Sequence, residues 1–121
     1  MDAKRKKELQ QQYKEMKTYY GVIQLKNDQN GKIFIDTVPN LKNRWSYYVM
    51  SLDSNRHPNK QLQEEWNAFG KEHFNYQVLF EKPNTDVTDM KFELKQLKKK
   101  WLEKLQPFGQ QGYHKIEELN K

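Results

Sequence analysis

Two short apolar segments joined by a turn place the tightest constraint on the fold of this chain. Residues 19–25 (YYGVIQL) and 32–37 (KIFIDT) are rich in aromatic and β-branched side chains, which favour β-strands. The intervening KNDQNG contains Asn30 and Gly31, a pair that readily adopts the positive φ angles of a tight turn. The sequence therefore predicts a β-hairpin.

Four other segments show helical periodicity. Apolar residues recur three or four positions apart within residues 2–18, 39–52, 59–69 and 88–105, which is the spacing of one helix face. The second of these helices is expected to begin near Pro39, because proline is typical of a helix start. The apolar stripes carry the three tryptophans, which are therefore expected to be largely buried: Trp45, Trp66 and Trp101.

One further strand completes the pattern. Within residues 74–80, Phe74, Tyr76, Val78 and Phe80 alternate along the chain, as expected for a strand with one buried face. The element order is then α-β-β-α-α-β-α, and the 121 residues are expected to form one domain. Three strands with helices on their faces make an α+β fold, in the form of a small α/β sandwich.

The composition excludes several kinds of protein. The chain has no cysteine, which rules out disulfide scaffolds, thiolate nucleophiles and cysteine zinc sites. No apolar run approaches the roughly 18 residues of a membrane span, and the N-terminus lacks the apolar stretch of a secretory signal. We therefore expect a cytoplasmic protein without membrane association. The histidines do not have the spacing of a zinc site: His57, His73 and His114.

The net charge of +6 is unevenly distributed along the chain. Residues 1–18 carry a net charge of +3 and residues 90–105 a net charge of +4, whereas the rest of the chain is close to neutral. Basic segments of this kind favour polyanions, because binding releases counterions. Lysine-rich helix faces are also common as solvated surface, so both interpretations stay open at this point.

Five blocks of the sequence resemble the GIY-YIG nuclease domain, known from homing endonucleases and the UvrC excision-repair subunit. The blocks are GVIQLKN, NGKIFID, NLKNRW, NKQLQEEWNAFGKEHFNYQVL and WLEKLQPFGQQGYHK, in this order within residues 20–114. The resemblance implies a three-stranded antiparallel sheet flanked by helices. It places the domain at residues 19–114. The apolar stripe of the N-terminal segment predicts a basic helix at residues 1–18 packed on this domain, and residues 115–121 are expected to form a flexible tail.

The resemblance also implies where an active site lies. The family uses a tyrosine as general base, a second tyrosine, a glycine that keeps the site open, an arginine for the phosphate, a glutamate that binds a divalent metal, and an asparagine. The arginine is retained as Arg44. The other five positions hold residues without these functions: Ile23, Phe34, Asp36, Lys98 and His114. The lysine position is defined to within one residue. Because a lysine cannot bind the Mg²⁺ that the family would use, no metal and no cofactor is expected.

Three functions are compatible with this pattern. The best supported is an inactive nuclease-like domain that binds the nucleic-acid backbone. The alternatives are a protein-interaction module and an active metal-dependent endonuclease with a rewired site. Arg44 is expected either to contact a phosphate or to pair with Asp36. We expect a monomer, and the identity of any protein partner is left open by the sequence. The backbone contacts are expected from a basic set: Arg44, Lys98, Lys99, Lys100, Lys4, Arg5, Lys6 and Lys7.

Overall fold

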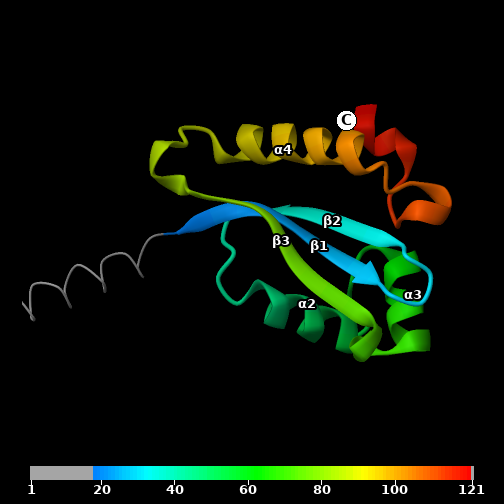
Figure 1. Cartoon of the computed structure of the whole chain (residues 1–121). Coiled ribbons are helices and arrows are strands. Elements are labelled where there is room, and N and C mark those ends of the chain that lie inside the picture. Colours follow the sequence, from blue (N-terminus) through cyan, green and yellow to red (C-terminus); the bar gives the residue numbers. More distant parts are fainter. Residues whose placement is uncertain (1–17, 121) are drawn as a thin grey trace, which may run out of the picture.

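The sheet predicted from the hairpin forms the centre of the protein (Figure 1). The computed structural model describes residues 18–120, so residues 1–17 of the expected N-terminal helix lie outside the described residues. Strands β1 (Tyr19–Asn27), β2 (Ile33–Val38) and β3 (Phe74–Pro83) form an antiparallel sheet in the order β2-β1-β3. The predicted fold class is therefore confirmed.

The hairpin turn between β1 and β2 is built as the sequence predicts. Gly31 has a φ of 76°, and its N–H donates to the last carbonyl of β1 at 2.8 Å. In the resulting register, Ile23 lies opposite Asp36, and Leu25 lies opposite Phe34. Directly opposed residues point to the same side of a sheet, so these four side chains share one face.

The alternation predicted for β3 holds only over its first half. Val22 and Ile23 of β1 pair with Phe80 and Val78, so a bulge leaves Leu79 without a partner on β1. An extra residue in one strand changes the side to which the following side chains point. Leu79 and Phe80 are partly buried against α4, whereas Val78 is 37% exposed. Val78 lies opposite Ile23 and therefore points to the same side as Phe74 and Tyr76, whereas the expectation that Phe80 shares this side is wrong.

Within residues 18–120, three α-helices flank the sheet: α2 (Arg44–Asp53), α3 (Lys60–Phe69) and α4 (Met90–Leu105). Side-chain caps define the starts of the last two. Asn59 accepts a backbone N–H of the first turn of α3, and Asp89 does the same for α4. The first helix begins later than the proline signal predicts, because Asn43 adopts the left-handed conformation (φ 57°) directly before it.

The helices form layers on both faces of the sheet (Figure 1). α2 and α3 pack on the face that carries Ile23 and Phe34, whereas α4 packs on the opposite face. Trp66 of α3 is buried, with 4% of its surface exposed. Trp45 and Trp101 lie at the margins of the two cores, where they pack against the buried residues and keep a smaller part of their surface exposed, so all three tryptophans are largely buried as predicted.

The segment after α4 runs along the outer edge of β2. Gly112 forms a parallel bridge with Ile33, and the Tyr113 N–H donates to the Ile33 carbonyl at 3.0 Å. Ile116–Asn120 then form a 3₁₀ helix, η4, whose Leu119 packs against the core on the α4 side. The segment expected to be a flexible tail therefore contains this 3₁₀ helix. Three more 3₁₀ segments are η1 (Lys71–His73), η2 (Asn84–Asp86) and η3 (Gly109–Gln111).

Within the part of the chain that the structure describes, no helix combines the length and the apolar character that crossing a bilayer requires.

Candidate functional site

Three of the predicted site residues meet on the sheet face that α2 covers. Ile23 and Asp36 are directly opposed on β1 and β2, and Phe34 lies two residues before Asp36 on the same strand. Ile23 is fully buried and Phe34 almost so. Their side chains carry no atom that accepts a proton, so the positions at which the resemblance implies tyrosines offer apolar surface instead.

Asp36 is engaged by a tyrosine of α2. The Tyr48 hydroxyl donates to a carboxylate oxygen of Asp36. Burial is the main cause that raises the pKa of Tyr48, and the negative charge of Asp36 adds to it, although the nearby Arg44 guanidinium opposes the shift. Tyr48 therefore stays protonated and keeps its hydroxyl on the carboxylate.

Arg44 stands one helical turn before Tyr48. Its guanidinium carbon lies 4.2 Å from the ring centre of Tyr47 and 5.4 Å from that of Tyr48. Within residues 18–120, Arg44 forms no ion pair with Asp36, and its buried Nε has no hydrogen-bond partner. The alternative that Arg44 pairs with Asp36 is therefore wrong, and the guanidinium is held by aromatic rings instead.

His57 joins this group although no sequence signal singled it out. It lies in the loop before α3, with its ring centre 5.2 Å from that of Phe34 and 6.2 Å from that of Tyr48. The Asn59 N–H donates to His57 Nδ1 at 3.0 Å, which places the proton of the neutral ring on Nε2. Burial lowers the pKa of His57, although the charge of Asp36 opposes this. The ring is therefore neutral and can donate from Nε2.

His114 reaches the site from the segment that covers the edge of β2. The Ile35 N–H donates to His114 Nε2 at 3.0 Å, so the proton of the neutral ring is on Nδ1, where the Glu118 carboxylate lies 3.2 Å away. The ring stacks on Phe34 with 5.0 Å between centres and 5° between planes. Burial lowers the pKa of His114, with its side chain only 2% exposed.

Lys98 completes a second polar group beside His114. Its Nζ lies 3.5 Å from Glu118 Oε1, so α4 brings this lysine next to the segment that carries His114 and Glu118. Burial would raise the pKa of Glu118, but the Lys115 N–H, His114 and Lys98 outweigh it, and the pKa is lowered. The ammonium and carboxylate charges therefore balance each other. Glu118 is a site residue that the sequence analysis missed, because its segment was expected to be flexible.

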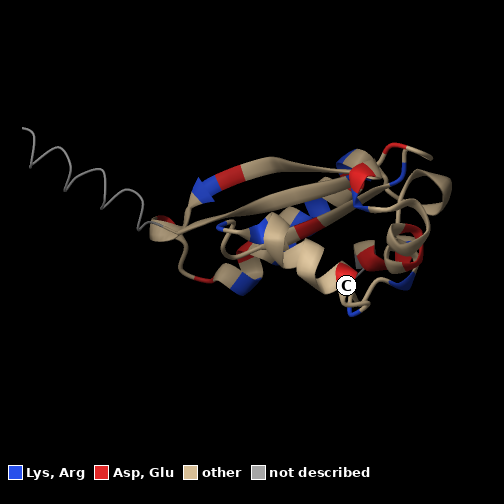
Figure 2. Ribbon diagram, turned by 90° about the horizontal axis from the view of Figure 1, so that it is seen from below, with Lys and Arg blue, Asp and Glu red and all other residues tan. Residues whose placement is uncertain are grey.

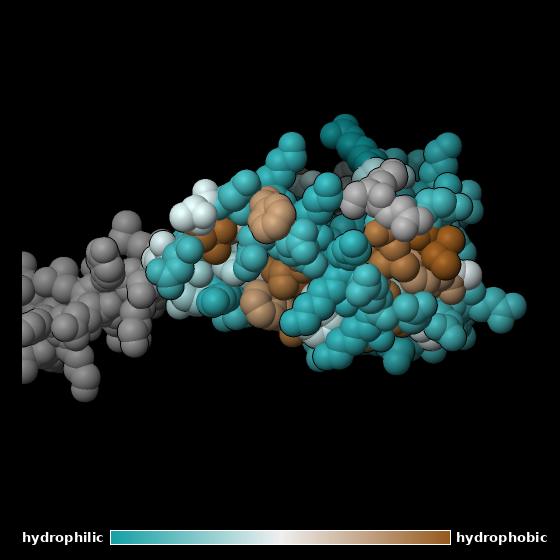
Figure 3. Space-filling view, turned by 90° about the horizontal axis from the view of Figure 1, so that it is seen from above, coloured by the Kyte–Doolittle hydropathy of each residue, from teal (hydrophilic) through white to brown (hydrophobic). Residues whose placement is uncertain are grey.

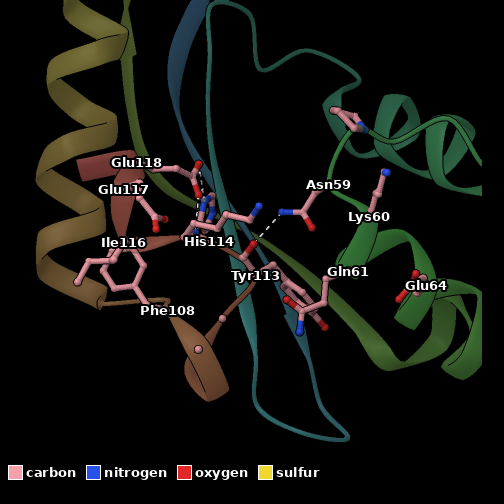
Figure 4. Close-up of a pocket in the computed structure, with 14 residues that line it drawn as sticks. Asn59, Lys60, Gln61, Glu64, Phe108, Tyr113, His114, Ile116, Glu117 and Glu118 are labelled. Atoms are coloured by element: carbon pink, nitrogen blue, oxygen red, sulfur yellow. Dashed lines mark hydrogen bonds and ion pairs between the residues drawn. The ribbon is translucent and has the colours of Figure 1, made fainter. Parts of the chain in front are cut away.

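A cleft of about 1260 Å³ opens between the start of α3 and the C-terminal segment (Figure 4). Asn59, which caps α3, and Lys60 and Glu64 of α3 line one side, whereas His114 and Glu118 line the other. The Asn59 amide bridges the two walls, because it donates to the Tyr113 carbonyl at 2.8 Å. Two lysines and three glutamates are among the residues that line the cleft, so it is not a strongly positive site.

The side chains at this site do not fit a divalent cation. Lys98 places an ammonium where the resemblance implies a metal ligand, and Glu118 already pairs with it. Within residues 18–120, no group of three or more histidine, aspartate or glutamate side chains could hold a metal ion. A hard cation such as Mg²⁺ needs several oxygen ligands that are not neutralised by a neighbouring ammonium.

The predicted basic residues do not gather in one place. Lys98 and Lys99 share a stripe of α4 with Lys91 and Lys95, which the sequence analysis did not single out, whereas Lys100 points away from it. Figure 3 shows that the side of the molecule seen from above, where α4 lies, is largely hydrophilic. Arg44 lies across the sheet, on a side where acidic segments are interspersed with basic ones (Figure 2). Residues 4–7 are outside the described residues.

Comparison with known proteins identifies the fold. No protein-family model matches the sequence, and no curated protein does. A mutant of the catalytic domain of the intron endonuclease I-TevI superposes with a TM-score of 0.62 and 24% identity, over 73% of this chain and 84% of that one. Another structure of the catalytic domain of this homing endonuclease superposes with a TM-score of 0.50 and 25% sequence identity, over 68% of this chain and 91% of that one. The chain therefore has a GIY-YIG-like nuclease fold.

Proposed function

We propose that this chain is a nuclease-like domain with a degenerate, non-hydrolytic site that binds the backbone of nucleic acid. Both similar structures are catalytic domains of an endonuclease, which makes nucleic acid the favoured class of ligand. The loss of hydrolysis is inferred from this chain's own side chains.

The proposal depends on one observation: each candidate base at the site already accepts a hydrogen bond from another group of the protein. His114 Nε2 receives the Ile35 N–H, and the Asp36 carboxylate receives the Tyr48 hydroxyl. His57 Nδ1 receives the Asn59 N–H. A general base must direct a free lone pair at the attacking water. Activation of water by either histidine would therefore first break a hydrogen bond of the fold, whereas the Asp36 carboxylate keeps lone pairs besides the one that the Tyr48 hydroxyl occupies.

The second half of the proposal concerns the retained cation. Arg44 keeps a guanidinium at the position where the family binds phosphate, without a carboxylate to neutralise it within residues 18–120. The lysines of α4 add a separate basic stripe. Contacts from both surfaces would go to phosphates, so affinity would depend strongly on salt and little on sequence. The residues proposed for these contacts are Arg44, Lys98, Lys99, Lys100, Lys4, Arg5, Lys6 and Lys7.

A titration of labelled DNA and RNA at two salt concentrations, with and without Mg²⁺, tests the proposal. We expect binding near 50 mM salt, weaker binding at higher salt, and intact nucleic acid in both metal conditions. Absence of binding at low salt would favour the protein-interaction module instead. Cleavage that disappears in Arg44→Ala would show an active enzyme with a rewired site.

Restoring the family residues gives the converse experiment. The variant combines Ile23→Tyr, Phe34→Tyr, Asp36→Gly and Lys98→Glu. We expect at most weak cleavage from it, because the surrounding side chains are arranged for the present residues and a site needs its supporting contacts as well. Strong cleavage would show that those four positions alone decide activity.

A further inference from the structure

The outer side of α2 exposes two large apolar side chains beside the retained arginine. Tyr47 is 53% exposed and Met50 is 70% exposed. They are three residues apart, so they are neighbours on one side of the helix. The buried residues of the same helix, Tyr48 and Leu52, pack against the sheet instead. Packing in the protein core therefore does not account for the Tyr47 ring.

The Tyr47 ring is held in a fixed orientation. The guanidinium of Arg44 lies over one face of the ring, 4.2 Å from its centre. The edge of the ring meets Tyr48, at 5.5 Å between centres and 78° between planes. Tyr48 is itself fixed by its hydrogen bond to Asp36. An aromatic ring that is already ordered loses little conformational entropy when a ligand stacks on it.

This combination of a fixed ring and an adjacent cation fits one class of ligand. A nucleobase stacks on an aromatic ring, and the phosphate next to it pairs with a guanidinium. In a duplex the faces of the bases are covered by their neighbours, so only an unpaired base can use the ring. An apolar peptide would use Tyr47 and Met50 but would leave the charge of Arg44 without a partner.

We propose that Tyr47 is a stacking platform for an unpaired nucleobase, with Arg44 holding the adjacent phosphate, so that the domain prefers single-stranded to double-stranded nucleic acid. This inference rests on the proposed function, since it names the form of nucleic acid that the domain binds. It assigns a part in binding to a residue outside the set predicted from the sequence.

Phe92 offers a matched control, because it is similarly exposed but, within residues 18–120, no lysine or arginine lies over its ring. It is 59% exposed at the start of α4. The hollow that it lines contains three carboxylates, those of Asp86, Asp89 and Glu93, against one lysine, Lys82. Negative charge at these positions repels a phosphate, so the ring is in a poor place for nucleotide binding.

The test measures the anisotropy of a labelled single-stranded oligothymidine and of a duplex of the same length. Tyr47→Ala should weaken single-strand binding by about 5- to 150-fold, the range that the loss of one stacked base gives. The salt slope should not change, because stacking releases no counterions. Arg44→Ala should lower that slope by about 0.7, the contribution of one phosphate contact. Tyr47→Phe should bind like the wild type, and duplex binding should not respond to either tyrosine variant.

Three results would overturn the inference, and they differ from one another. If the wild type binds but Tyr47→Ala binds the single strand equally well, the stacking platform is wrong and the proposed function stands. If Phe92→Ala weakens binding as much as Tyr47→Ala, the effect is not specific to the ring beside Arg44. If the wild type binds neither nucleic acid at low salt, the proposed function fails together with the inference. Far-ultraviolet circular dichroism of each variant checks that the fold is intact.

Discussion

Lowering the pH from 7 to 5 should destabilise this protein, because two histidines are held neutral in the folded state. The pKa values of His114 and His57 both lie below the ordinary histidine value of 6.5, with burial as the main cause in each case. Protonation of His114 would also remove the bond from the Ile35 N–H to Nε2. In the unfolded chain both rings take up a proton near their ordinary pKa.

The size of the effect follows from the difference in bound protons. Below pH 6.5 the unfolded chain binds more protons than the folded one, so the free energy of unfolding falls as the pH falls towards the lowered folded pKa values. Each histidine that stays neutral contributes about 1.4 kcal/mol per pH unit, or roughly 2 kcal/mol at pH 5. Asp36 faces both rings and Glu118 faces His114, and these carboxylates reduce the loss, whereas Lys98 increases it. At pH 5 the two histidines together therefore lower the free energy of unfolding by at most about 4 kcal/mol. This is a large part of a typical total stability.

Urea unfolding at pH 7, 6 and 5, followed by tryptophan fluorescence, measures this loss. His114→Gln should start from a lower stability at pH 7 but show a shallower decline, because one of the two rings is gone. His73→Gln is the matched control, since that ring is 35% exposed and lies 3.0 Å from Asp28; it should not make the decline shallower. A free energy of unfolding that stays constant between pH 7 and 5, or a decline equally steep in His114→Gln, would refute the reasoning.

Three further substitutions test other parts of the structure. Gly21→Ala would place a methyl carbon 1.8 Å from the Phe80 carbonyl oxygen, so we expect separation of β1 from β3 and loss of the cooperative thermal transition. Asn59→Ala removes the cap of α3 and should cost about 0.5–2 kcal/mol, measured as a lower urea midpoint with an unchanged m-value. Lys98→Glu sets a second carboxylate against Glu118 and should lower the melting temperature at pH 7 more than Lys98→Gln does; equal melting temperatures would show that their pairing is unimportant.

The fold was largely predictable because its strongest signals are local. The strand composition around Asn30 and Gly31 predicts the hairpin, and the apolar stripes predict the helices. The bulge at Leu79 could not be read from the sequence, because Leu79 and Phe80 are both apolar and either could take the buried side. The partial exposure of Trp101 could not be predicted either. An apolar stripe shows which side of a helix is buried, but not how far the neighbouring element covers each side chain.

The part of the site that lies on the hairpin was predictable, because the register of the two strands alone determines which side chains share a face. Ile23, Phe34 and Asp36 share a face as soon as the turn is fixed. His57 and Glu118 could not be predicted, since loops bring them to the site and their partners lie far away in the sequence. Such contacts depend on the packing of the whole domain, which periodicity does not report.

The position of β2 at the edge of the sheet has a consequence for protein synthesis. Its outer N–H and C=O groups are paired by residues 112–114, which are about 80 positions away in the chain. The ribosome therefore releases the hairpin long before the segment that covers β2. The other edge of β1 is also unpaired until β3 has been synthesised. During this interval the nascent chain carries open strand edges, which pair readily with other chains. Binding of a chaperone to the nascent hairpin, or slower translation after α4, would affect the yield of this protein more than that of a domain whose sheet closes locally.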